Sequence, residues 1–266
     1  MPEVPRIVPA QLNPEIDPEI WSDVNFFTKW GYLLVENAIT EDEVGVLRGA
    51  MDDLFLRREK KRDKNHKNKK ASKNFINEQF TKQLLEEDDR FTFLLDNPPV
   101  IKYMKAILGN CLQLHSATAR ITQPGDPDQD WHRDGPWPMD PEGTPFGSIP
   151  GQINCLYHLD ELTDKLGPTM IVPGSHRVPF APPVGHPQFP DEKKIYAKPG
   201  QAVLISGWLY HRGTANSSKK KRRGCYMCYQ NAWMKSRETF DGPRIKKLRE
   251  NGTPDQQLLL GGVTNW

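Results

Sequence analysis

Five short runs of apolar or alternating residues dominate the second half of this chain. They cover residues 112–123, 152–159, 169–172, 202–208 and 222–230. Stretches rich in proline and glycine separate several of them, most clearly at 124–151 and 179–190. Short strands divided by turn residues are typical of an antiparallel sandwich or barrel. Because helical segments do not alternate with these runs, the pattern does not favour a doubly wound parallel sheet.

The first 110 residues predict helices instead. Apolar residues recur at helical spacing after Thr40, and Thr40 with Glu43 forms a capping-box pair at the start of that helix. Residues 75–108 predict two further helical pieces, broken at Asn97 by the prolines that follow. We therefore expect a single domain over 1–266, with a mostly helical part at 1–110, a β core at 111–235 and a tail at 236–266.

Length and composition set the broad class. With 266 residues, of which 36% are hydrophobic, the chain can bury a sizeable core. No apolar run approaches the roughly 18 residues of a membrane span, and the N-terminal segment lacks the layout of a signal peptide. The last residues match no peroxisomal or endoplasmic-reticulum address. We expect a soluble, cytoplasmic protein with no membrane partner. The apolar run 258–262 fits a docking tail, a dimer contact or a cover for one end of the barrel.

The formal net charge of +2 hides a basic block at residues 57–73, which holds ten lysines and arginines and two acids. A block of like charge is usually solvated, so we expect an exposed loop or the frayed end of a helix. The block contains no aromatic ring, whereas nucleic-acid sites combine basic residues with stacking rings. We therefore expect no nucleic-acid partner. The remaining alternative is a contact with an anionic substrate or its carrier.

The closely spaced cysteines, Cys225 and Cys228, raise the question of zinc or thiol exchange. The run around them predicts a strand, in which residues three apart point to opposite faces. We therefore expect both thiols to pack in the core without a metal-binding or redox role.

His132 and Asp134 are the residues most informative about chemistry. In an extended backbone they project to the same side, so an imidazole and a carboxylate can reach one ion. His211, at the end of a later apolar run, is the candidate third ligand. Two histidines and one carboxylate on one face of an octahedron leave three positions open, as in non-haem iron(II) oxygenases. A catalytic zinc site, the alternative, offers one open position.

Arg222 gives such a site a second binding point. It opens the last apolar run, and strand alternation places it on the inner face with Gly224, whereas Arg223 points outward. A guanidinium binds a carboxylate in bidentate fashion. 2-Oxoglutarate matches both features, because its keto-acid end chelates iron and its distal carboxylate can meet the arginine. The sequence therefore predicts iron(II), 2-oxoglutarate and O2 as cofactor and co-substrates.

Three motifs follow one another along the chain. They are His132-Arg133-Asp134-Gly135, the segment GPTMIVPGSHR at 167–177, and His211-Arg212-Gly213-Thr214 followed by Arg222. A Gly-Tyr pair at 31–32 and a helix precede them. These motifs, their order and the gaps between them make residues 30–235 resemble the phytanoyl-CoA dioxygenase (PhyH-like) family of iron(II)- and 2-oxoglutarate-dependent oxygenases.

The resemblance implies a mainly β fold with N-terminal helices, namely a double-stranded β-helix of the jelly-roll or cupin-like kind. It implies that His132, Asp134 and His211 bind iron at the catalytic centre and that Arg222 anchors 2-oxoglutarate. Family members often carry a small hydroxylated residue two places after the distal histidine, where this chain has Gly213. Thr214 is the candidate in its place. Thr122 is a further candidate contact of 2-oxoglutarate if it faces the barrel.

The residues beside the metal motif suggest a pocket wall, and we expect Trp131 and Trp137 to line it. The remaining histidines, His115, His158, His176 and His186, match no ligand role in the family. Because a carboxylate stands at Asp134, where halogenases of this chemistry bind chloride, hydroxylation or desaturation of a small-molecule metabolite in specialised metabolism is favoured. Alternatives are 2-hydroxylation of an acyl-CoA, with residues 57–73 at the CoA phosphates, a barrel that binds without catalysis, and a nucleic-acid demethylase.

Overall fold

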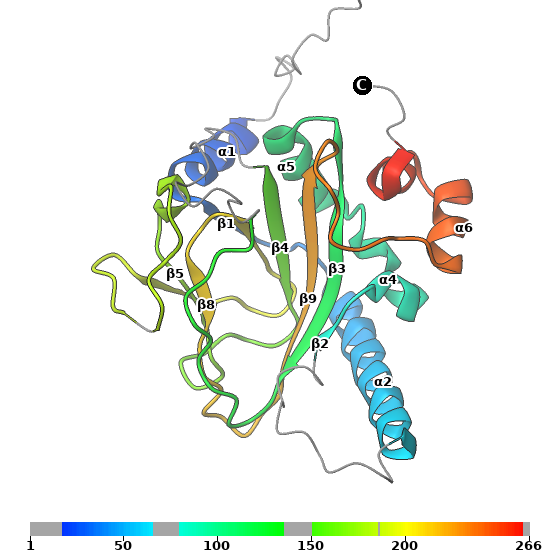
Figure 1. Cartoon of the computed structure of the whole chain (residues 1–266), viewed down its shortest axis with the longest axis horizontal. Helices are drawn as coiled ribbons and strands as arrows, with labels where there is room; N and C mark the ends of the chain where they lie inside the picture. The colour runs from blue at the N-terminus through cyan, green and yellow to red at the C-terminus, as the bar shows by residue number, and fades with distance from the viewer. Residues whose placement is uncertain (1–17, 66–79, 136–150, 186, 263–266) are drawn as a thin grey trace, which may run out of the picture.

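Two antiparallel sheets form the centre of the molecule (Figure 1). The computed structural model describes residues 18–65, 80–135, 151–185 and 187–262. In these residues, a six-stranded sheet has the order β1-β7-β4-β9-β3-β2 and a three-stranded sheet the order β6-β5-β8. The strands are β1 (Tyr32–Val35), β2 (Phe80–Thr81), β3 (Leu112–Thr122), β4 (Gln152–His158), β5 (Thr169–Ile171), β6 (Lys193–Ile195), β7 (Ala202–Ser206), β8 (His211–Gly213) and β9 (Arg222–Asn231). Each of the five predicted runs forms a strand.

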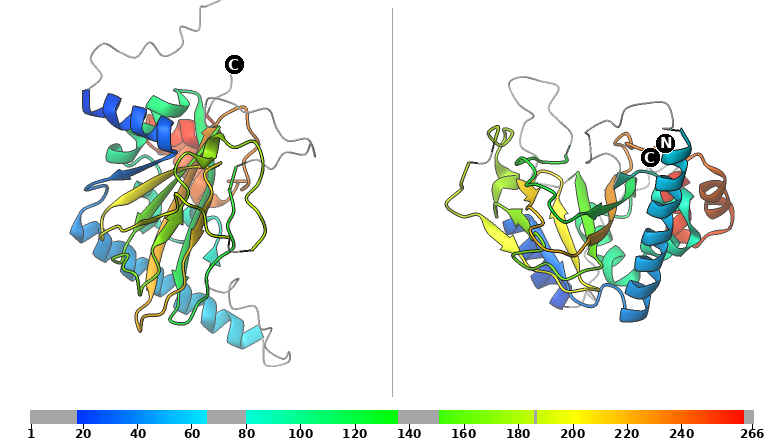
Figure 2. Two further views of the ribbon diagram at one scale, coloured as in Figure 1. Left: turned by 90° about the vertical axis from the view of Figure 1, so that its left-hand side faces the viewer. Right: turned by 90° about the horizontal axis from the view of Figure 1, so that it is seen from below.

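Helices cover one face of the large sheet, and the small sheet lies toward its other face (Figures 1 and 2). The helical elements are α1 (Pro18–Trp30), α2 (Glu41–Asn65), α4 (Leu84–Glu87), η1 (Asp89–Leu94), α5 (Pro98–Leu108), η2 (Ser175–Arg177), α6 (Pro243–Asn251), α7 (Pro254–Gln257) and η3 (Leu258–Gly262). In the described residues, no helix is both long and apolar enough to cross a bilayer.

Helix α2 begins where the capping box predicts. The Thr40 hydroxyl accepts from the Glu43 backbone N–H at 3.2 Å, and the Glu43 carboxylate accepts from the Thr40 N–H at 2.7 Å. The helix continues to Asn65, so the basic block starts within a helix, while residues 66–73 lie outside the described part.

The expected two helical pieces over 75–108 need a correction. Only the second piece is a regular helix, α5, which Asn97 precedes and Gly109 ends. The first consists of the short strand β2, a single turn α4 and the 3₁₀ segment η1. Gln83 interrupts any longer helix because its backbone is left-handed, with φ of 53°.

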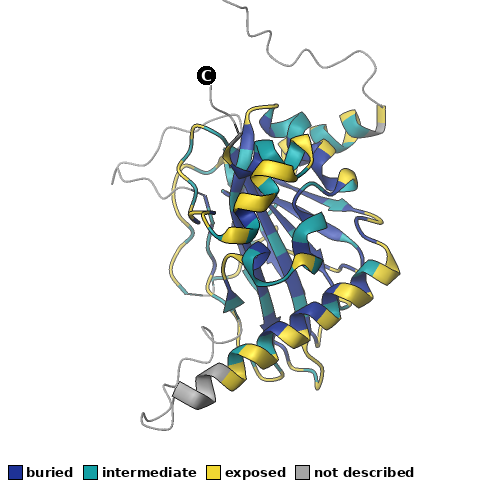
Figure 3. Ribbon diagram, turned by 90° about the vertical axis from the view of Figure 1, so that its right-hand side faces the viewer, coloured by how far each residue is buried: buried dark blue, intermediate teal, exposed yellow. Residues whose placement is uncertain are grey.

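The large sheet has one apolar face and one polar face. Side chains that point toward the helices are fully buried in one cluster, among them Ala117, Ala119, Cys155, Tyr157, Cys225, Met227 and Tyr229. Figure 3 shows these strands buried behind α2, whose outer side is exposed. The alternate side chains of β3, β4 and β9 line a cavity instead. The fold thus separates a hydrophobic core from a polar pocket by strand alternation.

The C-terminal tail packs onto the same core. Leu259 and Leu260 are 1% and 2% exposed and belong to the helix-facing cluster. The sequence left open a docking tail, a dimer contact or a cover for one end of the barrel, whereas in the structure these two leucines are buried in the chain's own helix-facing core.

Candidate metal centre

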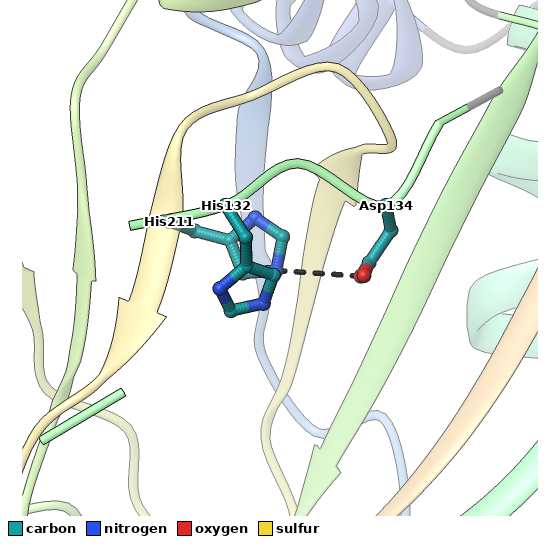
Figure 4. Close-up of side chains that lie close together, drawn as sticks. All are labelled: His132, Asp134 and His211. Atoms are coloured by element: carbon teal, nitrogen blue, oxygen red, sulfur yellow. Dashed lines mark ion pairs between the residues drawn. The ribbon is translucent and has the colours of Figure 1, made fainter. Parts of the chain in front are cut away.

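Two side chains of one loop and a third from a distant strand lie close together (Figure 4), and all three line the cavity. His132 pairs with His211, the first residue of β8, through reciprocal backbone hydrogen bonds of 3.0 and 2.9 Å. Asp134 follows two residues later and points toward the His211 ring. One potential ligand atom from each of His132, Asp134 and His211 lies within 4.8 Å of the others. The structure therefore brings together the three ligands that the sequence predicts.

Each histidine presents the correct nitrogen to a metal. His132 Nδ1 lies 2.8 Å from the Asp130 carbonyl, and His211 Nδ1 lies 2.9 Å from the Leu209 carbonyl. A carbonyl only accepts, so each Nδ1 carries the proton and each Nε2 keeps its lone pair. A hydrogen bond from the other ring nitrogen is the usual outer support of a metal-bound histidine.

The carboxylate of Asp134 is also held in place. Asn154 on β4 donates to its Oδ2 at 2.6 Å, and His211 Nε2 lies 3.3 Å from the same oxygen. Burial raises the pKa of Asp134, but the neighbouring His211 and His132 outweigh it and hold that pKa well below its usual range. His211 responds in the opposite direction: burial lowers its pKa, whereas Asp134 raises it above the ordinary value. Asp134 and His211 thus stabilise each other's charged form.

These donors fit iron(II). Two neutral imidazole nitrogens and one carboxylate on one side of a site are the 2-His-1-carboxylate set of non-haem iron enzymes. The set is partly enclosed, because His211 is 6% exposed whereas His132 and Asp134 are half-buried, and the His132 and His211 rings lie 4.3 Å apart.

Gly135 explains part of the first motif. A Cβ at this position would overlap the Trp208 indole, and the Gly135 N–H donates to the Gly207 carbonyl. Arg133 is buried and lies over the same indole at 5.9 Å. The segment after β7 therefore packs closely on the ligand loop, which only glycine permits.

The cavity beside these ligands has a volume of about 210 Å³ and an excess of positive charge. Among the described residues that line it are three arginines, Arg120, Arg222 and Arg237, and a single acid, Asp134. The arginines stand on β3, on β9 and just after β9. An anionic molecule therefore fits this cavity better than a cationic one.

Arg222 lies inside the cavity, as strand alternation predicts. It is 9% exposed, its Nη2 donates to the Thr122 hydroxyl at 3.0 Å, and its Nη1 donates to the Gly167 carbonyl. Burial lowers the pKa of Arg222, yet a guanidinium stays charged in proteins. Arg223 points to the opposite side, where it pairs with Asp52 at 3.0 Å and Asp160 at 3.1 Å.

Gly167 accounts for the second motif. Its φ is +88°, and a Cβ there would overlap the Thr214 carbonyl and lie 2.8 Å from Arg222 Nη1. Only glycine lets the backbone come this close to the guanidinium. The segment at 167–177 therefore holds the Arg222 guanidinium in position and supplies no metal ligand.

Thr122 and Thr214 differ in their positions. Thr122 is buried and supports Arg222, so it can act on an anion only through that arginine. The Thr214 hydroxyl donates to the Pro168 carbonyl at 2.6 Å, and Thr214 is not among the cavity-lining residues. A side chain at Gly213 would lie 2.7 Å from the Gln129 amide oxygen and 3.4 Å from Arg222 Nη2. The Gln129 side chain therefore occupies the space of the family's hydroxylated residue.

Trp131 does not line the cavity, contrary to the expectation. Its ring packs against Phe189 at 5.2 Å, and its Nε1 donates to the Pro187 carbonyl at 3.0 Å. The reason is alternation, because His132 faces the metal site and its neighbour faces away. Trp137 lies outside the described residues.

The remaining histidines and the cysteines have varied surroundings. His176 packs against Gly31, and its Nε2 lies 3.1 Å from the Thr28 carbonyl, a structural position. Cys225 is buried among the helices, whereas Cys228 faces the cavity side, 2.5 Å from the Asn154 amide oxygen. Burial raises the pKa of both thiols above the usual range. Their opposite orientation agrees with the predicted strand.

Sequence reasoning missed several polar residues of the site. Asn154, Gln129 and His158 line the cavity, and Asn216 is fully buried in the turn before β9. The Asn216 amide donates to the Thr122 and Lys220 carbonyls, which holds that turn and hence Arg222. Asn154 and His158 share strand parity inside an otherwise apolar run, and this was the available signal.

Fold and site together define a protein with two antiparallel sheets, helices on one face of the larger sheet, and a cavity lined by an arginine and by two histidines and one aspartate that could hold a metal ion. The sequence profile described as phytanoyl-CoA dioxygenase (PhyH) matches residues 27–224. The chain therefore belongs to the phytanoyl-CoA dioxygenase family.

Two curated relatives are dioxygenases of Aspergillus species. Dioxygenase hkm4 of Aspergillus hancockii is 38% identical over 98 residues, which cover 36% of this chain and 30% of that protein. Dioxygenase trt7 of Aspergillus terreus is 31% identical over 122 residues, which cover 43% and 39%. The matched part thus spans less than half of either relative.

Solved structures share the fold. HygX from Streptomyces hygroscopicus, with nickel and 2-oxoglutarate bound, superposes with a TM-score of 0.61 at 14% identity, covering 81% of this chain and 88% of that one. The α-ketoglutarate-dependent epimerase SnoN from nogalamycin biosynthesis gives 0.61 at 16% identity, covering 81% and 82%.

Proposed function

We propose that this chain is an iron(II)- and 2-oxoglutarate-dependent dioxygenase that hydroxylates or desaturates a small-molecule metabolite. In this proposal residues 1–266 act as one oxygenase domain built on a double-stranded β-helix. The observation that carries it is the presence of Arg222 in the same cavity as His132, Asp134 and His211. A metal set alone serves many reactions, whereas a buried arginine beside it specifies an anionic co-substrate.

The residues divide the work among them. His132, Asp134 and His211 would hold iron(II), which when bound supplies the oxygen chemistry and chelates the keto-acid end of 2-oxoglutarate. Arg222 orients the co-substrate by its distal carboxylate, and Thr122 and Gly167 keep the guanidinium in place. Asn154 keeps the Asp134 carboxylate turned toward the histidines.

The substrate class rests on several supports. The family and the two named relatives are dioxygenases, and SnoN of the same fold acts in nogalamycin biosynthesis. The acyl-CoA alternative depends on the basic block. There Arg58 already pairs with Glu87 at 2.5 Å, and the lysines after Asn65 lie outside the described residues. A small metabolite of specialised biosynthesis is therefore the leading substrate.

An anaerobic titration tests the reaction class. Adding iron(II) and then 2-oxoglutarate to the metal-free protein should produce the weak visible charge-transfer band of the chelate, followed in air by slow succinate release. His211→Ala should remove the band, because the remaining two ligands no longer hold the metal tightly. The matched control, His176→Ala, removes a histidine that is not part of the group that could hold the metal, and it should keep the band. A folded wild-type protein with neither band nor succinate would leave the non-catalytic barrel as the better interpretation.

A further inference from the structure

His158 is a buried polar group that the metal centre does not use. It ends β4 on the cavity side and is only 3% exposed. Its Nε2 is buried and has no hydrogen-bond partner among the described residues. An unsatisfied buried polar atom costs about 1–3 kcal/mol, so a native structure that keeps one calls for an explanation. His158 is not part of the group that could hold a metal ion.

The strand register places His158 near the arginine. His158 pairs with Gly224 across β4 and β9, and Arg222 lies two residues before Gly224 in β9, on the same face. Both side chains line the same cavity. Burial, together with the charge of Arg222, lowers the pKa of His158 to about 3, so the imidazole is neutral near pH 7. The cavity therefore combines a fixed cation with a neutral ring that has a spare nitrogen.

A carboxylate at Arg222 needs more donors than that arginine supplies. Its two amino groups each already give a hydrogen bond to the protein, at Thr122 and Gly167. An ionised carboxylate accepts up to about four hydrogen bonds. The residue that family members often use as helper is Gly213 here, and the Thr214 hydroxyl is turned to the Pro168 carbonyl. Neither Gly213 nor Thr214 therefore offers a hydroxyl donor to this carboxylate, and the Gln129 amide oxygen beside Gly213 accepts from the Gly213 N–H at 2.9 Å.

We propose that His158 donates a hydrogen bond from Nε2 to the distal carboxylate of 2-oxoglutarate bound at Arg222. This inference rests on the proposed function, because it assigns a residue to its co-substrate. His158 is then a binding residue that distinguishes 2-oxoglutarate from keto acids without a second carboxylate.

Two keto acids isolate this contact. 2-Oxoglutarate and pyruvate share the end that chelates iron, but only 2-oxoglutarate has the distal carboxylate. Their dissociation constants are measured anaerobically from the visible band of the iron(II) protein. For His158→Phe, which keeps a ring and removes the nitrogens, 2-oxoglutarate should bind about 10- to 100-fold more weakly, the range for a hydrogen bond to a charged group. Pyruvate binding should change less than about threefold.

Two more variants complete the test. His158→Gln places an amide N–H near the Nε2 position and should restore most of the affinity for 2-oxoglutarate. His115→Phe is the matched control, because His115 also has an unpaired buried nitrogen but does not line the cavity, and its affinities should stay at wild-type values.

The failures of the two proposals differ. Equal weakening of both keto acids in His158→Phe, or an unchanged preference for 2-oxoglutarate, would assign His158 a structural role and overturn the inference while the enzyme class stands. No binding of either keto acid to the folded wild-type iron protein would remove the proposed function and this inference with it.

Discussion

At the scale of single residues, Arg222 and Arg223 are neighbours with the same charge and opposite tasks. Strand β9 turns Arg222 into the cavity and Arg223 to the opposite side, where it pairs with the exposed Asp52 and the half-buried Asp160. Surface ion pairs contribute little to stability, whereas a buried guanidinium that binds a carboxylate contributes several times more. The difference lies in the environment, because the residue type is identical.

Alanine at Arg222 should therefore weaken 2-oxoglutarate binding, whereas alanine at Arg223 should not. We expect Arg222→Ala to weaken 2-oxoglutarate binding at least about 100-fold, because a charge-assisted bidentate contact is lost. Arg223→Ala is the matched control and should leave that affinity within about threefold. Titration of the visible band at rising 2-oxoglutarate concentration measures both. Weaker binding in Arg223→Ala alone would mean that the two arginines had been assigned to the wrong faces.

The sequence predicts which way such side chains point only where they lie in a regular strand, whose side chains alternate between its two faces. His132, Asp134, His211 and Arg222 follow from strand parity and from the family motifs, and the structure brings them together. Trp131 follows the same parity but was assigned by its proximity to the motif, so its orientation was missed. The Thr214 hydroxyl turns to a carbonyl 46 residues earlier, which no local pattern indicates.

At the scale of elements, α2 shows what local sequence controls. Its start follows from the Thr40–Glu43 box, and its buried stripe of Val44, Leu47, Met51 and Leu54 follows from helical spacing. The short strands β2, β6 and β8 carry too few residues for a pattern, and they exist because longer partners pair with them. Their positions were therefore not predictable from propensity.

Two substitutions at the start of α2 should change stability in opposite directions. Thr40→Ala removes the cap and should lower the free energy of unfolding by about 1 kcal/mol. Gly45→Ala should raise it by about 0.5–1 kcal/mol, because a Cβ there meets nothing within 4 Å and alanine favours the helix. Urea denaturation measures both changes. A destabilised Gly45→Ala protein would contradict the helix geometry described here.

At the scale of the whole molecule, one sheet separates two environments. Its helix-facing side carries a core that draws residues from α1 to the tail at Leu260, and its other side carries the polar cavity. The cavity side of the sheet holds buried titratable groups that have little contact with water. His158 shows the consequence, since burial and the charge of Arg222 lower its pKa from 6.5 to about 3. At a pH between these two values, His158 is therefore neutral in the folded protein and protonated in the unfolded chain.

This difference sets the direction of acid sensitivity. Between pH 6.5 and 3 the unfolded state binds the His158 proton and the folded state does not, so stability rises with pH and is complete above 6.5. One such group changes the free energy of unfolding by up to about 1.4 kcal/mol per pH unit, or about 2 kcal/mol between pH 7 and 5. Asp88, whose pKa its partner Arg90 lowers to about 2, adds a loss only below about pH 4.

His158→Gln removes this titration and gives the sharpest test. We expect wild-type stability to fall between pH 7 and 5, measured by urea denaturation of the metal-free protein, and the variant to lose about 2 kcal/mol less over the same interval. His115 and His176 have lowered pKa values from burial and remain in both proteins, so their contribution cancels in the difference. Parallel pH profiles would mean that His158 reaches water in the folded state. The cavity would then admit water at the end near Arg222.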